Sequence, residues 1–194
     1  SKENNIKLVQ ISTDHFFSGD KNKKHKENNK ITILNNYAKT KLLAEQYSKL
    51  HNDHIVVRTN FTGLRKKASQ QTFLEWILQS FKQKKPTFVF DDFYCSTIDV
   101  NSLSNILYDL IHLNYKGLIN IGSRDVFTKK QFVKELMKVL KLNKNLIKDG
   151  SVRKLKTKRA ESLGLNVAKV EKILKYNMPS INQVCNNLIK DIKR

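Results

Sequence analysis

Apolar residues in the first part of the chain form two short runs separated by a helically spaced stretch. Residues 6–13 (IKLVQIST) and 55–59 (IVVRT) are rich in β-branched side chains and bounded by polar segments, a pattern typical of buried strands. Residues 35–51 between them predict a helix. The face that we expect this helix to bury carries Ala38, Leu42, Leu43, Tyr47 and Leu50. Strand, helix and strand in this order favour a right-handed parallel crossover, and hence an α/β sheet.

The rest of the chain continues this alternation. Further helices are predicted over residues 70–84 and 100–113, from Thr128, near 167–174 and from Ser180, with strands at 87–90 and 117–121. Gln131 stands three residues after Thr128, and Gln183 three after Ser180, so both pairs fit capping boxes. Residues 141–159 are basic and poorly periodic, and we assign them no regular element.

The composition is that of a folded, strongly basic chain. Its 194 residues are 39% hydrophobic, so a packed core is expected, and 37 Lys and Arg against 17 Asp and Glu give a formal net charge of +20. No apolar stretch is long enough to span a membrane, and no signal peptide is visible. Cys95 and Cys185 have no metal-type spacing. We therefore expect a cytoplasmic protein with no membrane partner and no metal.

The net charge raises the question of nucleic-acid binding. Arginine is scarce, lysines are scattered over the whole chain, and no nucleic-acid-binding module is recognisable. We expect no nucleic-acid partner, and keep a nucleic-acid-binding protein only as a third hypothesis, whose signature would be a steep loss of binding with salt. His51 and His54 are three residues apart without an acidic or thiol partner, so we expect them at the surface rather than on a metal.

The strongest chemical signal is the run Tyr37-Ala-Lys-Thr-Lys41 at the start of the first predicted helix. Residues four apart lie on one helix face, about 5–6 Å apart at Cβ, so the Lys41 ammonium can stabilise the phenolate of Tyr37. Such a phenol can act as a general acid or base toward a carbonyl or an alkoxide. The preceding strand ends in Ser12-Thr13-Asp14, and ligands of parallel sheets bind beyond the carboxyl ends of strands. The Thr13 hydroxyl could therefore bind the oxygen that Tyr37 protonates.

These motifs resemble the extended short-chain dehydrogenase/reductases, and most closely the dTDP-4-dehydrorhamnose reductase group. The runs that carry the resemblance are ISTDHFFSG at 11–19, YAKTK at 37–41 with Glu45, and VVRTNF at 56–61. Weaker similarities follow in FDDFYCST at 90–97, in GLINIGS at 117–123 and in the late pattern from Arg159 to Lys169. The resemblance spans nearly the whole chain.

The resemblance implies a reductase of a nucleotide-activated 4-keto-6-deoxy sugar that uses NADPH or NADH. Tyr37, Lys41 and Thr13 would be catalytic, and Tyr37 and Lys41 would also contact the cofactor. Thr13, Asp14 and Phe61 would bind substrate, and Asn60 would lie at the cofactor. An epimerase of the same superfamily uses the same Tyr and Lys, and a non-catalytic binding or regulatory relative would keep the cleft without turnover, so both stay open as alternatives.

The sequence departs from the family pattern in two ways. Phe61 stands where the family usually has Trp, and His15 where it usually has Tyr, which leaves the sugar undetermined. The six glycines, at 19, 63, 117, 122, 150 and 164, form no Gly-rich turn for a dinucleotide pyrophosphate.

The resemblance therefore covers the C-terminal part of a Rossmann-type parallel sheet plus a small α/β substrate-binding domain. We expect residues 1–62 and about 97–125 in the sheet part, and about 63–96 and 126–194 in the substrate part. We also expect an open edge on the first strand, and little reductase activity from this chain alone. A separate chain could supply the cofactor-binding half, and a homo-oligomer is equally open.

Overall fold

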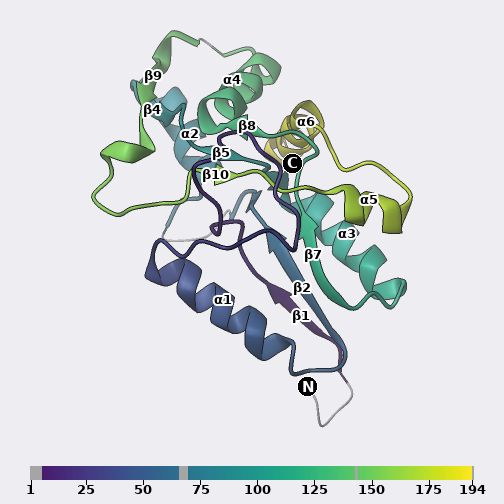
Figure 1. Cartoon of the computed structure of the whole chain (residues 1–194). Helices are drawn as coiled ribbons and strands as arrows, with labels where there is room; N and C mark the ends of the chain where they lie inside the picture. Colours follow the sequence, from purple (N-terminus) through teal and green to yellow (C-terminus); the bar gives the residue numbers. More distant parts are fainter. Residues whose placement is uncertain (1–5, 66–69, 143, 194) are drawn as a thin grey trace.

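A three-stranded parallel sheet forms the centre of the molecule. The computed structural model describes residues 6–65, 70–142 and 144–193 (Figure 1). Strands β1 (Leu8–Ile11), β2 (His54–Thr59) and β7 (Gly117–Ile121) lie side by side in the order β1-β2-β7. β2 takes the middle place because its apolar, β-branched residues are buried almost from end to end. β1 is at the edge, and no described residue pairs with its free side.

Helices cover both faces of this sheet. Helix α1 (Asn36–Ser48) packs on one face, against β1 and β2. Helices α3 (Val100–His112) and α5 (Ala168–Leu174) pack on the other face (Figure 1). Ile55 and Val57 point from β2 into a core shared with α3 and α5. Alternate residues of a strand face opposite sides, so Val56 and Arg58 are directed toward α1.

A second core lies in the other half of the molecule. Helix α2 (Phe73–Lys82), helix α4 (Lys129–Leu140) and helix α6 (Ile181–Lys193) enclose it, together with β4 (Thr87–Phe90). Helices α4 and α6 pack directly on each other (Figure 1). The remaining elements are short: β3 (Phe61–Thr62), β5 (Tyr94–Cys95), β6 (Ile98–Asp99), β8 (Phe127–Thr128), η1 (Lys144–Leu146), β9 (Ile147–Gly150), η2 (Val152–Lys154) and β10 (Ser162–Leu163).

The short strands make three small sheets beside the central one. β3 pairs with β6 and β4 with β9, both in parallel, and β5 lies between β10 and β8. The β3–β6 pair connects the two halves of the molecule, since β3 follows β2 and β6 leads into α3, which packs on the central sheet. We propose the division 1–62 with about 97–125, and about 63–96 with 126–194, for the folded chain. Within the second range, the segment 165–178 packs on the central sheet rather than on the second core.

The predicted α/β fold and its parallel crossover are confirmed. Each predicted helix and strand is present, and the ends differ by a few residues. Thr128 and Gln131 form the capping box expected for α4, and Ser180 and Gln183 exchange the same two hydrogen bonds before α6. Residues 141–159, to which no element was assigned, contain β9 and two short 3-10 helices.

The predicted buried face of α1 is confirmed for Ala38 and Leu42, which pack in a buried cluster, and wrong for its other three residues. Leu43, Tyr47 and Leu50 are 48%, 72% and 70% exposed, whereas Glu45 and Ser48 are buried. The reason is a buried ion pair. Glu45 pairs with Arg58 of β2, and this contact turns the polar face of the helix toward the sheet.

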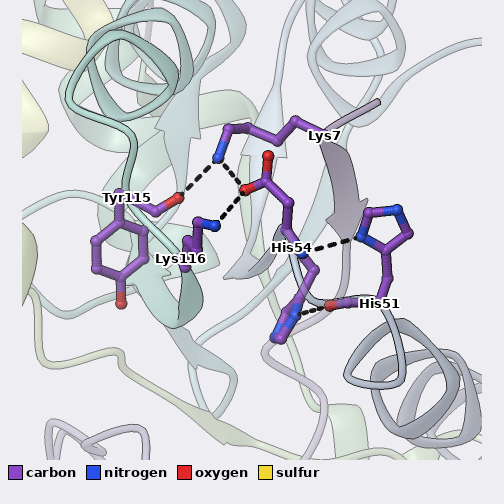
Figure 2. Close-up of polar contacts among 6 residues, drawn as sticks. Lys7, His51, His54, Tyr115 and Lys116 are labelled. Carbon is purple, nitrogen blue, oxygen red and sulfur yellow. Dashed lines mark hydrogen bonds and ion pairs between the residues drawn. The ribbon is translucent and has the colours of Figure 1, made fainter. Parts of the chain in front are cut away.

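The amino-terminal ends of the central strands meet at Asp53. Lys7 before β1 and Lys116 before β7 both form ion pairs with the Asp53 carboxylate, and Lys7 also donates to the Tyr115 carbonyl oxygen at 3.3 Å (Figure 2). The hydrogen bond from Lys7 holds the pKa of Asp53 below its ordinary value. This cluster lies at the end of the sheet opposite to the carboxyl ends of the strands.

The expected surface position is wrong for His51, which is 8% exposed. Its Nδ1 accepts from the Asp53 backbone N–H at 3.0 Å, and its carbonyl oxygen contacts the ring of His54 (Figure 2). Both rings thus take part in the turn that leads into β2. In the described part of the chain no three His, Cys, Asp or Glu side chains are grouped to hold a metal ion, and no helix is long and apolar enough to cross a membrane.

Candidate active site

Helix α1 presents Tyr37 and Lys41 on one face. Asn35 caps the helix, since its side chain accepts from the Ala38 N–H at 2.9 Å, so the first turn begins immediately before Tyr37. The Lys41 ammonium lies 6.0 Å from the centroid of the Tyr37 ring and donates to the Ile11 carbonyl oxygen at 3.2 Å. Lys41 therefore connects the helix to the carboxyl end of β1, and Tyr37 stays half-exposed beside it.

The same helix face continues to Glu45, one turn further on. The Arg58 guanidinium donates from Nε and Nη2 to the two Glu45 oxygens at 2.9 and 2.8 Å, and Ser12 Oγ donates to Oε1 at 2.5 Å. Both charged side chains are shielded from solvent. The ion pair fixes α1 against β1 and β2, and with it the positions of Tyr37 and Lys41.

Thr13 lies at the carboxyl end of β1 and is 2% exposed. Its Oγ1 accepts from the His15 backbone N–H at 3.2 Å. The His15 ring stands edge-on to Tyr37 with the centroids 5.6 Å apart. His15 thus lies between Thr13, which its backbone contacts, and Tyr37, which its ring contacts.

Asp14 is fully enclosed, with 1% of its surface exposed, and neither carboxylate oxygen has a hydrogen-bond partner in the described structure. Burial raises the pKa of Asp14 to about 7, against the opposing charge of Lys129. Burial also lowers the pKa of His15 to about 4, and Arg159 and Lys129 add to the shift. The site therefore holds a carboxyl group that can carry a proton near neutral pH, beside an uncharged imidazole.

Three of the predicted residues, Tyr37, Asn60 and Phe61, line two cavities, whereas Thr13, Asp14 and Lys41 are not among the lining residues of either. Tyr37 and His15 line a cavity of about 570 Å³ that Arg159 also borders. Asn60 and Phe61 line another of about 410 Å³. The buried Phe93 ring is shared by the two sides, since it lies 6.0 Å from the His15 ring and 5.7 Å from the Lys129 ammonium. Asn60 is held by Thr97, whose hydroxyl donates to Asn60 Oδ1 at 2.9 Å.

Lys129 and Phe93 were not identified from the sequence as site residues. The capping box at Thr128 predicts where α4 begins, and so marks Lys129 as its first residue. It gives no indication that the Lys129 side chain extends toward Asp14, because that depends on how α4 packs on the central part. Phe93 lies in a segment without periodicity.

The match to known proteins decides the family. The family model described as RmlD substrate binding domain matches residues 1–194. The chain belongs to the RmlD substrate binding domain family. The family resemblance carried by the STD, YAKTK and VVRTNF runs is therefore confirmed. No curated protein matches the chain.

Solved structures similar to this RmlD-type chain share its fold. The dTDP-4-dehydrorhamnose reductase of Bacillus anthracis, in complex with NADP, matches with a TM-score of 0.83 and 23% identity, over 95% of this chain and 66% of that chain. The reductase of Yersinia enterocolitica matches with 0.81 and 18%, over 96% and 68%. The dTDP-glucose 4,6-dehydratase of Bacillus anthracis, in complex with NAD, matches with 0.79 and 18%, over 99% and 63%.

The RmlD-type chain thus spans about two thirds of the length of these proteins. Identities below a quarter establish the fold alone. A reductase and a dehydratase match this fold almost equally well, so the reaction has to be argued from the side chains.

Proposed function

We propose that this chain is the catalytic and substrate-binding portion of an NAD(P)H-dependent reductase of a nucleotide-activated 4-keto-6-deoxy sugar. The observation that carries the proposal is the shared helix face of Tyr37 and Lys41 at the carboxyl end of β1, where Lys41 donates to Ile11 and the buried pair of Glu45 and Arg58 holds the helix. The ordered set of a phenol, an ammonium and a hydroxyl at the carboxyl end of a parallel strand suits proton transfer to a carbonyl oxygen.

The reaction adds a hydride to the keto carbon and a proton to its oxygen, so that C=O becomes CH–OH. A bound NADPH or NADH would supply the hydride. Tyr37 supplies the proton from its phenol, and the Lys41 ammonium stabilises the phenolate that remains. The Thr13 hydroxyl holds the same substrate oxygen, and the half-exposed Phe61 ring contacts the sugar. The Asp14 carboxylate, which the resemblance assigns to the substrate, is enclosed in this structure and takes no part in that contact.

The residues present fit one end of a dinucleotide. Asn60 and Phe61 line a cavity at the carboxyl end of β2, and Lys41 uses one of its three N–H groups on Ile11, which leaves donors for a ribose hydroxyl. The sequence contains no Gly-rich turn to bind the pyrophosphate. These residues therefore fit the nicotinamide end and not the phosphate end.

The edge of β1 is open to a further strand among the described residues. β1 hydrogen-bonds to β2 on one side, and no described residue pairs with the other. About a third of each similar structure has no counterpart in this chain. We propose that a cofactor-binding portion, on the same polypeptide or on a separate one, adds its strands to this edge, and that a nucleotide sugar is the substrate.

The test is a reduction assay with a dTDP-4-keto-6-deoxy sugar and NADPH. The chain is assayed alone and after fusion to the N-terminal portion of the Bacillus anthracis reductase that has no counterpart here. NADPH fluorescence verifies that the fusion binds cofactor. We expect negligible turnover alone and sustained NADPH oxidation by the fusion.

Two results would contradict the proposal. A folded fusion that binds NADPH and reduces none of the 4-keto sugar would favour a non-catalytic relative, and inversion of a sugar centre without net NADPH oxidation would favour an epimerase. Robust turnover by the isolated chain would refute the proposed need for a further portion.

A further inference from the structure

A polar groove lies between α3, α6 and the turn that precedes α6 (Figure 1). Two cavities of about 360 and 370 Å³ share Ser102, Asn105 and Asn187, so they form one continuous groove. Each volume is in the range of small-molecule sites. None of its described lining residues contributes to the cavity of Tyr37 or to that of Phe61, so the groove is separate from the site of the proposed reaction.

The lining of this groove consists mainly of side-chain amides. Both helices and the turn before α6 contribute them, and the five amides are those of Asn101, Asn105, Asn177, Gln183 and Asn187. One cation and one anion are among the described lining residues, Lys190 and Asp191, so their formal charges cancel. In a chain with a formal net charge of +20, this balance argues against an anionic ligand. The polar lining argues equally against an apolar ligand.

A buried carboxylate fixes two of the residues that the cavities share. Asp99, which is 0% exposed, accepts from Ser102 Oγ at 2.8 Å and from Asn187 Nδ2 at 3.2 Å. Nδ2 of Asn187 also donates to Ser102 Oγ at 3.2 Å. The Asn187 amide is thereby held in one orientation, and its Oδ1 accepts no hydrogen bond from any described residue. A ligand that donates to this oxygen would bind a group already in place, which lowers the entropic cost of binding.

Two unpaired amides and an aromatic ring also line the groove. Asn105 and Asn177 are exposed, and their side chains form no hydrogen bond within the described part of the chain. The Tyr176 ring is 42% exposed, and its hydroxyl donates to Asp109 Oδ2 at 2.7 Å, which holds the ring in place. The groove thus offers free hydrogen-bond donors and acceptors together with an apolar ring face.

We propose that this groove binds a neutral saccharide of two or more sugar rings. Each sugar hydroxyl both donates and accepts, and an amide offers both functions through its N–H groups and its carbonyl oxygen. The C–H groups on one face of a sugar ring can pack on the Tyr176 ring. A nucleobase presents one polar edge, whereas the amides here are spread over two adjoining cavities. Saccharide binding in this groove is independent of the proposed reduction.

The experiment is a titration of the isotope-labelled 194-residue chain, followed through the side-chain amide signals in its NMR spectra. The probes are glucose, maltose and cellobiose, with adenosine as the alternative ligand. We expect saturable shifts of the Asn105 and Asn187 amide signals with maltose or cellobiose. Glucose should bind more weakly, because one ring occupies only one of the two cavities. The affinity should not change with salt concentration, because the ligand carries no charge to be screened.

Asn105→Ala should weaken disaccharide binding about 3–10-fold, because the hydrogen bonds of one amide are lost. Asn177→Ala should have a similar effect. The matched control is Asn186→Ala, which removes an amide from α6 outside the lining of the groove and should change the affinity less than about 2-fold. Thermal melting verifies that each variant is folded.

A folded parent chain that binds neither disaccharide would overturn the proposal, as would equal disaccharide affinities of the parent and the Asn105→Ala and Asn177→Ala variants. Shifts confined to signals from outside the groove would overturn it as well, because the saccharide would then bind elsewhere. Binding of adenosine without binding of a disaccharide would assign the groove to a nucleobase instead. None of these readouts needs turnover, so a failure of the proposed reduction would leave saccharide binding in this groove unaffected.

Discussion

Glu45 of α1 and Arg58 of β2 form a buried, two-bond ion pair, with N–O distances of 2.9 and 2.8 Å and side chains 0% and 3% exposed. The guanidinium also donates to the Glu27 carbonyl oxygen at 3.0 Å and lies over the Phe16 ring at 5.0 Å. One side chain of β2 thereby fixes a helix and a long loop. The rotation of α1 that aligns Tyr37 and Lys41 with the end of β1 follows from this pair.

Breaking this pair should be costly. Glu45→Ala leaves the Arg58 charge buried without a partner, so we expect a loss of about 3–5 kcal/mol in the free energy of unfolding, measured by urea titration. The control is Asp20→Ala, which breaks the exposed pair with Lys23 and should cost at most about 1 kcal/mol. Similar losses in both variants would mean that the buried pair does not hold α1 in place.

Tyr37→Phe should abolish the proposed reduction without affecting folding. The phenol is half-exposed and donates no hydrogen bond in the described structure, so stability should change by less than about 0.5 kcal/mol. In the fusion to the cofactor-binding portion, turnover should fall about 100-fold or more, because the proton donor is lost. Tyr47→Phe on the same helix is the matched control and should be fully active. An active Tyr37→Phe variant would exclude Tyr37 as the acid.

Asp14→Asn should stabilise the protein above neutral pH. Burial raises the pKa of Asp14 from 3.8 to about 7, so ionising it in the folded state costs stability that grows as pH rises from about 4 to about 7 and then stays constant. The variant escapes this cost. Its free energy of unfolding should equal that of the parent near pH 4 and exceed it by about 1–4 kcal/mol at pH 8.

Asp149→Asn is the control, because the pKa of Asp149 is shifted in the opposite direction to that of Asp14. The hydrogen bond from Lys130 lowers the pKa of Asp149, so its contribution is present above pH 3.8 and disappears in acid. This variant should be less stable than the parent at pH 8 and equal to it at low pH. A pH-independent difference between Asp14→Asn and the parent would show that Asp14 is not held in its protonated form.

The free edge of β1 should be visible in hydrogen exchange. Backbone N–H groups of Leu8–Ile11 that face away from β2 have no described partner, so they should exchange quickly in the isolated chain. Mass spectrometry of a peptide covering β1 should show slower exchange after fusion to the cofactor-binding portion, while β2 stays equally protected. Unchanged exchange in β1 would place that portion elsewhere.

Periodicity was sufficient to predict the main elements, because they bury continuous or helically spaced apolar faces. β2 is buried as its IVVRT run indicates, and α4 starts at the capping box of Thr128 and Gln131. Strands of two residues, such as β3 and β6, have no period to detect. β9 pairs with β4 across a long sequence interval, which a local pattern does not reveal.

The positions of the candidate site residues could be predicted where a local spacing determines them. Tyr37 and Lys41 share a face by helix geometry alone, and Thr13 follows from the end of a strand. The inward polar face of α1 was missed, since Glu45 is stabilised there by Arg58, a partner on another element. The approach of Lys129 to the site depends in the same way on the packing of two halves of the molecule.

The most direct measurement of the central claim is isotope transfer from cofactor to sugar. The fusion to the cofactor-binding portion is incubated with a dTDP-4-keto-6-deoxy sugar and with NADPH that carries deuterium at the transferable position. The sugar product is then analysed by mass spectrometry. We expect one deuterium at the former keto carbon, dependent on Tyr37. A folded, cofactor-binding protein whose sugar product carries no deuterium would contradict the assignment of this chain as the catalytic portion of a reductase.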